Sequence, residues 1–396
     1  MNIQYALFEK VDLPPTENGK YVAVVNGNYF YIGDILYFIL QKLKEKSGAE
    51  EIKSYLRLKK EINVEDDVLE SILEEAVEKL KLDKNPEDIV STGRSRYIYL
   101  NAEIIKENLL QKITNPFTFL FKGKLFLVLL LSSFFITGYH IFNVATFGDN
   151  AGRVLLSAGN LGIIYLVIGL ILFAHEMGHA TACKRYDVSP KNISFGFYLI
   201  FPVFFTDVTK AWVLTKKNRI VINCGGIYFQ LLINTLLIAF YALTPNKSET
   251  ASIMLNAIIF TNTSVVIYSL IPFMRYDGYW IYSDFFDLPN LMKRSFKYPF
   301  ALFDKTNKTE GDKINWPLLA YSLSNYVLLI FFFIVMTKFY QNSIVYFKDY
   351  LESGNLSSLF TRENFKGIFR MIIFAGMTIV VLYRFIKAGR NFINQI

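Results

Sequence analysis

The chain has 396 residues, enough for two or three soluble domains, but 53% of them are hydrophobic and 16% are aromatic. Charged residues are concentrated in the first quarter and in a few short loops, so the composition excludes an entirely soluble protein. The net charge of +8 comes mostly from basic residues flanking apolar runs, which favours contact with a membrane over binding to nucleic acid. Two cysteines, Cys183 and Cys224, are too few for a disulfide framework or a cysteine zinc site.

The first quarter of the chain predicts a small cytoplasmic domain. Its N-terminus has no basic segment followed by an apolar one, so we expect no cleavable signal peptide. Residues 21–32, YVAVVNGNYFYI, are two β-rich runs joined by Asn-Gly-Asn, which predicts a β-hairpin. Three amphipathic helices follow within residues 33–48, 49–62 and 63–82, the last with Asn63 as its N-cap. This order predicts a winged-helix-like α+β domain of about 65 residues.

The hairpin, the GDILYFILQKL helix, the SGAEEI link and the acidic third helix resemble the PqqD-like recognition element of ribosomally made peptide pathways, over roughly residues 18–85. We call this N-terminal domain the head. The resemblance implies that the head binds the leader of a precursor peptide as an added strand. Tyr29, Phe30 and Tyr31 are then the candidate peptide-binding residues. A DNA-binding winged helix and a purely structural cap are the alternatives. The acidic third helix argues against DNA, because phosphate contacts need Lys and Arg.

Apolar run lengths predict six membrane spans, so the fold class is mainly α: a polytopic helical membrane protein with a small N-terminal domain. The spans fall near residues 125–147, 156–183, 219–243, 252–273, 316–338 and 366–388. Lys and Arg are frequent in the loops 184–218 and 275–315 and in the C-terminal tail, but rare in the short loops near 148–155 and 244–251. The positive-inside rule therefore predicts that both termini are cytoplasmic.

A candidate metal site lies at the end of the second span, in the stretch LGIIYLVIGLILFAHEMGHATACKRYDV, residues 161–188. It holds His175 and His179, two of the three histidines in the chain. Residues four apart share one face of a helix, so the two imidazoles can bind one metal ion. Glu176 lies beside them and can act as a general base on a metal-bound water. Two imidazoles and a carboxylate favour Zn²⁺, although iron or cobalt would also fit.

A tetrahedral catalytic zinc site needs a third protein ligand. Asp277, in IPFMRYDGYW, is the best candidate because the predicted topology puts it at the same membrane depth as the two histidines. His140, in the first predicted span, is the alternative, although this topology places it toward the outer side. Asp277 could instead cap a helix or pair with Arg275.

FAHEMGHA, followed by IPFMRYDGYWIYSDFFDLPNL, resembles the site-2-protease-type intramembrane zinc metallopeptidases, and in particular the peptide zinc metalloproteases. The resemblance covers about residues 124–300. It implies that His175, His179 and Asp277 are the zinc ligands, that Glu176 is the general base, and that the protein lies in a bacterial cytoplasmic membrane.

Three further details concern this resemblance. FGFYLIFPVFFTDVTKAW is similar to the family's membrane-dipping strand segment, which aligns substrate as an added strand. NCGGIYFQ resembles its small-residue packing motif, in which Gly225 and Gly226 permit close approach of helices. Ile271 stands where the family usually has Asn, which leaves open how this chain fulfils that role. The last two predicted spans resemble nothing that we can name.

These observations predict a recognition domain at residues 1–90, a linker at 91–123, a metallopeptidase core at 124–300 and two further spans at 301–396. The leading hypothesis is a membrane-embedded zinc endopeptidase that processes a precursor peptide captured by its leader. Expected partners are that peptide and the lipid bilayer, with no nucleic acid; the sequence does not give the oligomeric state. One alternative is a regulatory protease that releases a membrane-tethered transcription or anti-sigma factor. The other is a non-catalytic peptide export or immunity protein.

Overall fold

The structure of the chain is a computed structural model that divides into two compact units, Met1–Pro289 and Asn290–Ile396. The residues that it describes are 5–15, 21–26, 28–83, 98–145, 147–198, 201–273, 275–288, 290–302, 314–352, 375–376, 378–379 and 383. The predicted domain limits at residues 90, 123 and 300 stay predictions.

The N-terminal part of the first unit contains the predicted hairpin and the three predicted helices. A short helix and strand precede them, and β1, β2 and β3 form an antiparallel sheet in that order. The elements are α1 (Tyr5–Phe8), β1 (Val11–Asp12), β2 (Tyr21–Val25), β3 (Asn28–Ile32), α2 (Asp34–Lys44), α3 (Ala49–Lys60) and α4 (Asp66–Leu80). Its winged-helix-like character stays a prediction.

One detail of the third helix differs from the sequence prediction. Helix α4 begins at Asp66 with Glu65 at the cap position, so Asn63 is not its N-cap. Val64 lies between them and is buried in the core of this domain, which draws the chain inward before the helix starts.

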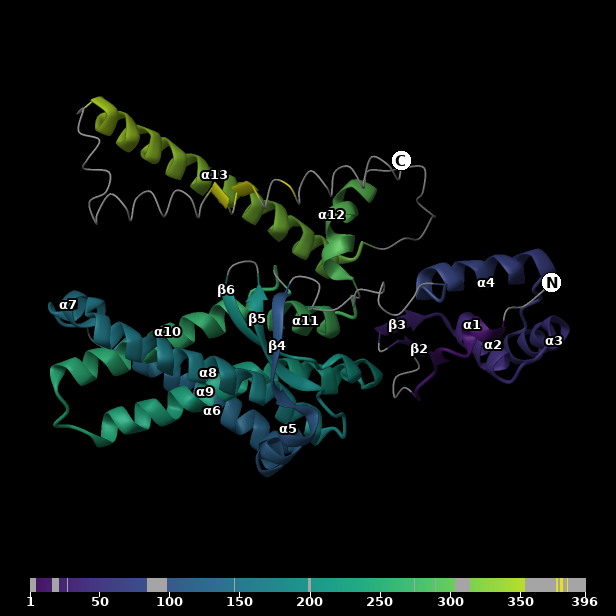
Figure 1. Ribbon diagram of the computed structural model, residues 1–396, viewed down its shortest axis with the longest axis horizontal. Coiled ribbons are helices and arrows are strands. Elements are labelled where there is room, and N and C mark those ends of the chain that lie inside the picture. The colour runs from purple at the N-terminus through teal and green to yellow at the C-terminus, as the bar shows by residue number, and fades with distance from the viewer. Residues whose placement is uncertain are drawn as a thin grey trace. The chain divides into compact units, whose positions relative to one another are not determined.

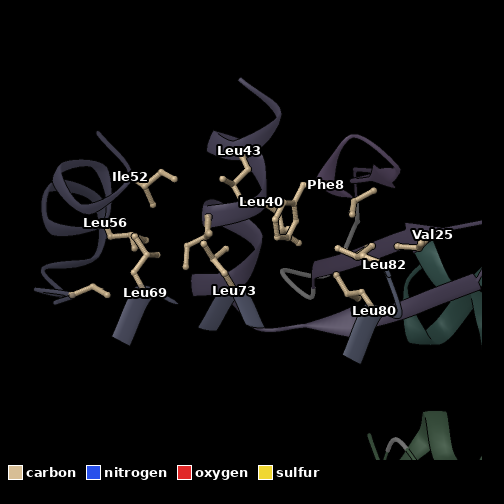
Figure 2. Close-up of a cluster of buried hydrophobic side chains, with 14 residues drawn as sticks. Phe8, Val25, Leu40, Leu43, Ile52, Leu56, Leu69, Leu73, Leu80 and Leu82 are labelled. Atoms are coloured by element: carbon tan, nitrogen blue, oxygen red, sulfur yellow. The ribbon is translucent and has the colours of Figure 1, made fainter. Parts of the chain in front are cut away.

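The head is held together by buried apolar side chains from α1, β1, β2, α2, α3 and α4 (Figure 2). Each of the three longer helices contributes residues three or four apart, which lie on one face. The fully buried members include Ala23, Ile39, Leu40, Ile52, Leu56 and Leu69. Burying a Leu or Ile side chain contributes about 1.5–3 kcal/mol, so this small core is what lets the head fold.

Five helices within the described residues are long and apolar enough to cross a membrane. They are Gly123–Val144, Ala158–Arg185, Lys216–Leu243, Glu249–Leu270 and Trp316–Lys338. These correspond to the first five predicted spans, while most of the sixth, 366–388, lies outside the described residues. Large apolar side chains are exposed along them, among them Phe135, Tyr165, Leu166 and Leu236. Lipid is the environment in which such surfaces are stable.

Four of these helices pack in the first unit (Figure 1). They are α6 (Gly123–Tyr139), which continues into the π-helix η3 (His140–Val144), then α8 (Ala158–Arg185), α9 (Lys216–Leu243) and α10 (Glu249–Leu270). Shorter elements join or cover them: α5 (Glu107–Thr114), η2 (Asn115–Phe121), α7 (Ala151–Leu156), η4 (Thr209–Val213) and α11 (Asp277–Phe285).

Helices α8 and α9 approach each other closely at Gly178 and Gly225. A Cβ atom built on Gly178 would lie 2.2 Å from the carbonyl oxygen of Gly225, and one built on Gly225 would lie 2.7 Å from the carbonyl oxygen of Gly178. Only glycine at both positions permits this approach, as in other tightly packed membrane helices.

A second antiparallel sheet lies beside this helical core. Its strands are β4 (Ile98–Lys106), β5 (Asn192–Tyr198) and β6 (Phe201–Thr206), with β5 in the centre. Strands β5 and β6 form the segment whose sequence is similar to a membrane-dipping strand. Strand β4 comes from the predicted linker, about ninety residues earlier in the chain, and its pairing with β5 has two register shifts.

The second unit contains α12 (Leu291–Ala301) and α13 (Trp316–Glu352), which pack against each other. The hydroxyl of Tyr298 accepts a hydrogen bond from the backbone N–H of Asn315 at 2.6 Å, and Tyr326 packs edge-on against Phe296. These contacts tie the start of the fifth span to the helix before it.

We expect Gly178→Ala to destabilise the protein by about 1–3 kcal/mol or more, because the added methyl group forces the α8 and α9 backbones apart. Gly169→Ala is the matched control on the same helix, since a Cβ atom added at Gly169 would meet no neighbouring atom within 4 Å. Thermal unfolding in detergent measures both. Equal melting temperatures for the two variants would contradict the close contact between the helices.

Candidate functional site

The last third of α8 forms the centre of the candidate site. The first half of the helix exposes apolar side chains, whereas residues 175–183 are buried. His175, Glu176 and His179 are 9%, 6% and 2% exposed, and their ligand atoms lie within 4.8 Å of one another. Burying an ionisable group costs free energy unless a hydrogen bond, an opposite charge or a metal ion partners it, so this cluster requires such partners.

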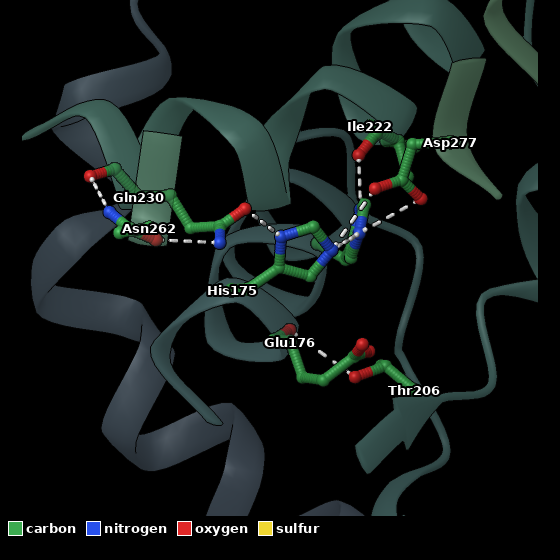
Figure 3. A network of polar contacts seen from close by, with 8 residues as sticks. His175, Glu176, Thr206, Ile222, Gln230, Asn262 and Asp277 are labelled. Atoms are coloured by element: carbon green, nitrogen blue, oxygen red, sulfur yellow. Dashed lines mark hydrogen bonds and ion pairs between the residues drawn. The ribbon is translucent and has the colours of Figure 1, made fainter. Parts of the chain in front are cut away.

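Both imidazoles are oriented through Nδ1 (Figure 3). Nδ1 of His179 lies 2.7 Å from the backbone oxygen of Ile222, and Nδ1 of His175 lies 2.8 Å from Oε1 of Gln230. Because both oxygens are acceptors, each Nδ1 must donate its hydrogen. In the neutral imidazole, Nε2 then carries a lone pair, and the two Nε2 atoms lie only 3.1 Å apart.

Asp277, at the start of α11, brings a third acceptor to the same point. Its carboxylate oxygens lie 3.0 Å from Nε2 of His175 and 3.3 Å from Nε2 of His179. With both imidazoles neutral, three electron-pair donors therefore converge on one point. Ligand atoms about 2.0–2.1 Å from a tetrahedral zinc ion are about 3.3 Å apart. The three residues thus match the donor set and the spacing of a zinc site.

Asp277 is ionised in this environment. Burial alone would raise the pKa of its carboxyl, but the His179 and His175 imidazoles, when protonated, lower it, and the balance leaves the pKa well below its ordinary value. A buried carboxylate facing two imidazole nitrogens needs positive charge between them, which a metal ion supplies.

Glu176 approaches from a different side of the histidines than Asp277 does (Figure 3). Its Oε2 is buried and has no hydrogen-bond partner among the described residues. A carboxylate oxygen is seldom buried without a partner, so an unpartnered one marks a place where a substrate or water group belongs. Its backbone oxygen accepts a hydrogen bond from Oγ1 of Thr206, the last residue of β6.

Helix α9 supports both histidines along one face, at residues spaced three or four apart. Ile222 supplies the carbonyl that binds His179, and Gln230 binds His175. Between them, a Cβ on Gly226 would lie 2.4 Å from Nε2 of His175, so the imidazole occupies the space that a larger side chain would fill.

The same helix also fixes α11, which carries Asp277. Nε and Nη2 of Arg219 donate to Oδ1 of Asp284 at 2.8 and 2.6 Å, and Asn223 donates to the other oxygen at 3.3 Å. Asp284 lies seven residues after Asp277, about two helical turns along the same face. This partly buried clamp, which we define as Arg219, Asn223 and Asp284, sets the position of the short helix.

The other candidates from the sequence lie elsewhere. His140, the first residue of η3, pairs with Asn256 of α10 through Nε2 at 3.0 Å. Ile271 is the C-cap residue that follows α10, and it is 39% exposed. Phe30 packs against the core of the head, and Tyr31 lies edge-on to Trp212 with ring centroids 5.1 Å apart. Tyr29 pairs with Val24 across the hairpin. Their role in peptide binding stays a prediction.

Sequence reasoning missed Gln230, Thr206 and the clamp. A signal was present, since Arg219 and Gln230 are polar residues at or within an apolar run, and such residues usually carry a function or a partner. The partner of Arg219 is 65 residues distant in the chain and that of Gln230 is 55 residues distant, which no local pattern reveals.

Comparison with known proteins gives one informative similarity. The chain is 29% identical over 129 residues to the "Putative peptide zinc metalloprotease protein YydH" of Bacillus subtilis (strain 168). The match covers 32% of this chain and 48% of the relative, so the chain spans about half the length of the relative that it matches. No family model and no solved structure matches the chain.

We expect Asp284→Ala to destabilise the protein by about 3–5 kcal/mol, because it leaves the buried guanidinium of Arg219 without its carboxylate. The double variant Arg219→Leu/Asp284→Ala should lose less stability than the single variants Arg219→Leu and Asp284→Ala added together. Glu107→Ala is the control: its ion pair with Lys210 is half-exposed and 3.5 Å long, so its loss should cost about 0–1 kcal/mol. Chemical unfolding in detergent measures these differences. Strict additivity in the double variant would argue against a clamp.

Proposed function

We propose that this protein is a membrane-embedded zinc endopeptidase that processes a ribosomally made precursor peptide. The observation that carries the proposal is the convergence of two Nε2 atoms and a carboxylate beside an unpartnered, buried glutamate. The similarity to a protein named as a peptide zinc metalloprotease points to the same chemistry.

His175, His179 and Asp277 would hold the zinc ion. When bound, the ion acts as a Lewis acid and lowers the pKa of a coordinated water to near 7. The protein residues contribute orientation: the hydrogen bonds at both Nδ1 atoms hold each Nε2 lone pair toward Asp277. Iron or cobalt would suit the same ligands, but the imidazole and carboxylate set and the named relative favour zinc.

Glu176 would move the protons of the reaction. Its free oxygen can accept a proton from the attacking water as the new C–O bond forms at the scissile carbonyl. It can then donate that proton to the leaving nitrogen as the C–N bond breaks. A site that held metal only for structure would have no use for a buried carboxylate without a partner.

Strand β6 is the element best placed to align a peptide. It is an edge of its sheet within the described residues, and it contacts α8. Its last residue, Thr206, is bonded to the backbone of Glu176. An extended substrate that pairs with β6 would thus run beside the catalytic glutamate, with its backbone groups satisfied by the sheet.

The head would capture the leader in the same way. Val25 and Asn28 close a two-residue hairpin, so the backbone N–H and C=O of Tyr29 point away from β2. A leader bound there tethers the rest of the peptide to the enzyme, which raises its effective concentration at the active site.

The five apolar helices favour a membrane as the environment of this part of the chain, and the distribution of Lys and Arg favours cytoplasmic termini. The head and the peptide would then meet in the cytoplasm, where precursor peptides are made. We therefore propose a bacterial cytoplasmic membrane as the location.

We expect the detergent-purified protein to carry about one zinc ion per chain, and both His179→Ala and Asp277→Ala to lose it. Glu176→Gln should keep the zinc, because Glu176 is not a ligand, but should cleave peptides about 10²–10⁴-fold more slowly. Metal is measured by mass spectrometry, and cleavage by product analysis with a proteome-derived peptide library. A well-folded wild-type protein without metal, or a fully active Glu176→Gln variant, would refute the proposal.

We expect Tyr29→Pro to weaken peptide binding by the head at least tenfold, because proline removes an outward backbone N–H from the strand edge. Tyr29→Ala keeps that N–H and is the matched control. Photocrosslinking of the full-length protein to a library of extended peptides reports binding. Equal loss in both variants would instead assign the role to the tyrosine side chain.

A further inference from the structure

A row of amide side chains is buried between α9 and α10, at membrane-spanning positions. Gln230 and Asn234 come from α9, and Asn262 comes from α10. All three are at most 1% exposed. Unsatisfied amides in such surroundings would each cost several kcal/mol, so each one needs its partners.

The row is joined by continuous hydrogen bonds that start at the candidate metal site, and Figure 3 shows the part from His175 through Gln230 to Asn262. His175 meets Oε1 of Gln230, and Nε2 of Gln230 donates to Oδ1 of Asn262 at 2.8 Å. Nδ2 of Asn262 donates to Oδ1 of Asn234 at 2.8 Å and to the backbone oxygen of Gln230 at 3.1 Å. Asn234 then donates to Thr263, whose hydroxyl donates to the backbone oxygen of Ile259.

The Thr263 end of this row fixes which group donates and which accepts in each of its hydrogen bonds. A backbone carbonyl can only accept, so the hydroxyl of Thr263 must donate to Ile259 and accept from the NH₂ group of Asn234. The oxygen of Asn234 therefore faces the NH₂ group of Asn262, and the oxygen of Asn262 faces the NH₂ group of Gln230. The second bond of Asn262, to a backbone oxygen, imposes the same orientation independently.

Only the oxygen of Gln230 is then left to meet His175. His175 must donate from Nδ1, which leaves a lone pair on Nε2 facing Asp277. His179 differs, because its Nδ1 is held by the backbone oxygen of Ile222, which no side-chain substitution removes. The orientation of His175 thus depends on a side chain, whereas that of His179 does not.

We propose that Gln230 is a positioning residue for the metal site: held by Asn262, it keeps His175 in the tautomer and orientation that bind the metal. This inference rests on the proposed zinc site. Outer-shell partners of metal-binding histidines generally contribute about 10–100-fold to metal affinity.

The competing explanation is that the amides only hold α9 and α10 together. Asn234 distinguishes the two explanations. It belongs to the same row of buried amides and joins the same two helices, but it has no hydrogen bond to His175. A variant at Asn234 therefore loses helix contacts alone, while a variant at Gln230 loses helix contacts and the bond to His175.

The experiment compares zinc affinity, by chelator competition, in detergent-purified full-length variants. We expect Gln230→Met to bind zinc about 10–100-fold more weakly than wild type. Gln230→Glu keeps an oxygen acceptor for Nδ1 of His175 but loses the NH₂ group that binds Asn262, so it should recover only part of this loss. Asn234→Leu should stay within about threefold of wild type, although its melting temperature should fall as far as that of Gln230→Met. The Co²⁺ absorption spectrum of each variant reports the ligand geometry and should change only at position 230.

Asn262→Leu offers a second variant, because it leaves Gln230 in place but removes the groups that orient it; we expect a smaller loss in the same direction. Unchanged zinc affinity in Gln230→Met or Asn262→Leu would overturn the inference, as would an equal loss in Asn234→Leu. Failure of the proposed function looks different: the wild-type protein itself would then bind no zinc, which would overturn both proposals.

Discussion

The contact between the backbones of α8 and α9 at Gly178 and Gly225 is the constraint on which the candidate site depends. The histidines lie on one helix and their supports on the other, so the imidazole bonds exist only if the helices are this close. Any side chain at either glycine would move Ile222 and Gln230 away from the rings. Helix α9 is therefore as much a part of the site as α8, although it contributes no metal ligand.

The second constraint is electrostatic. Bringing a carboxylate and two nitrogen lone pairs within about 3.3 Å is unfavourable in a buried setting unless a cation lies between them. The chain holds this arrangement with a rigid frame: the clamp fixes α11, and both Nδ1 atoms are bonded to α9. Such a frame keeps the acceptors together, so binding of a metal ion need not reorganise the protein.

The sequence predicted what depends on local spacing. The hairpin, the helices of the head, five of the spans and the pairing of His175 with His179 on one face all follow from periods of two or 3.6 residues. Asn63 shows the limit even of local rules, because burial of Val64 outweighed a favourable cap residue. The strand β4, the clamp and Gln230 could not be predicted, since their partners are brought near only by the tertiary fold.

The three histidines of the chain show why burial alone does not make a metal ligand. His140 is as buried as His179 and, like His175, bonds to a side-chain amide. It uses Nε2 to bond Asn256 and packs edge-on against Tyr241, so it contributes to helix packing. In His175 the amide takes Nδ1 instead, which leaves Nε2 for the point where His179 and Asp277 converge. The choice of nitrogen, imposed by the neighbouring amide, is thus what separates a structural histidine from a candidate ligand in the same protein.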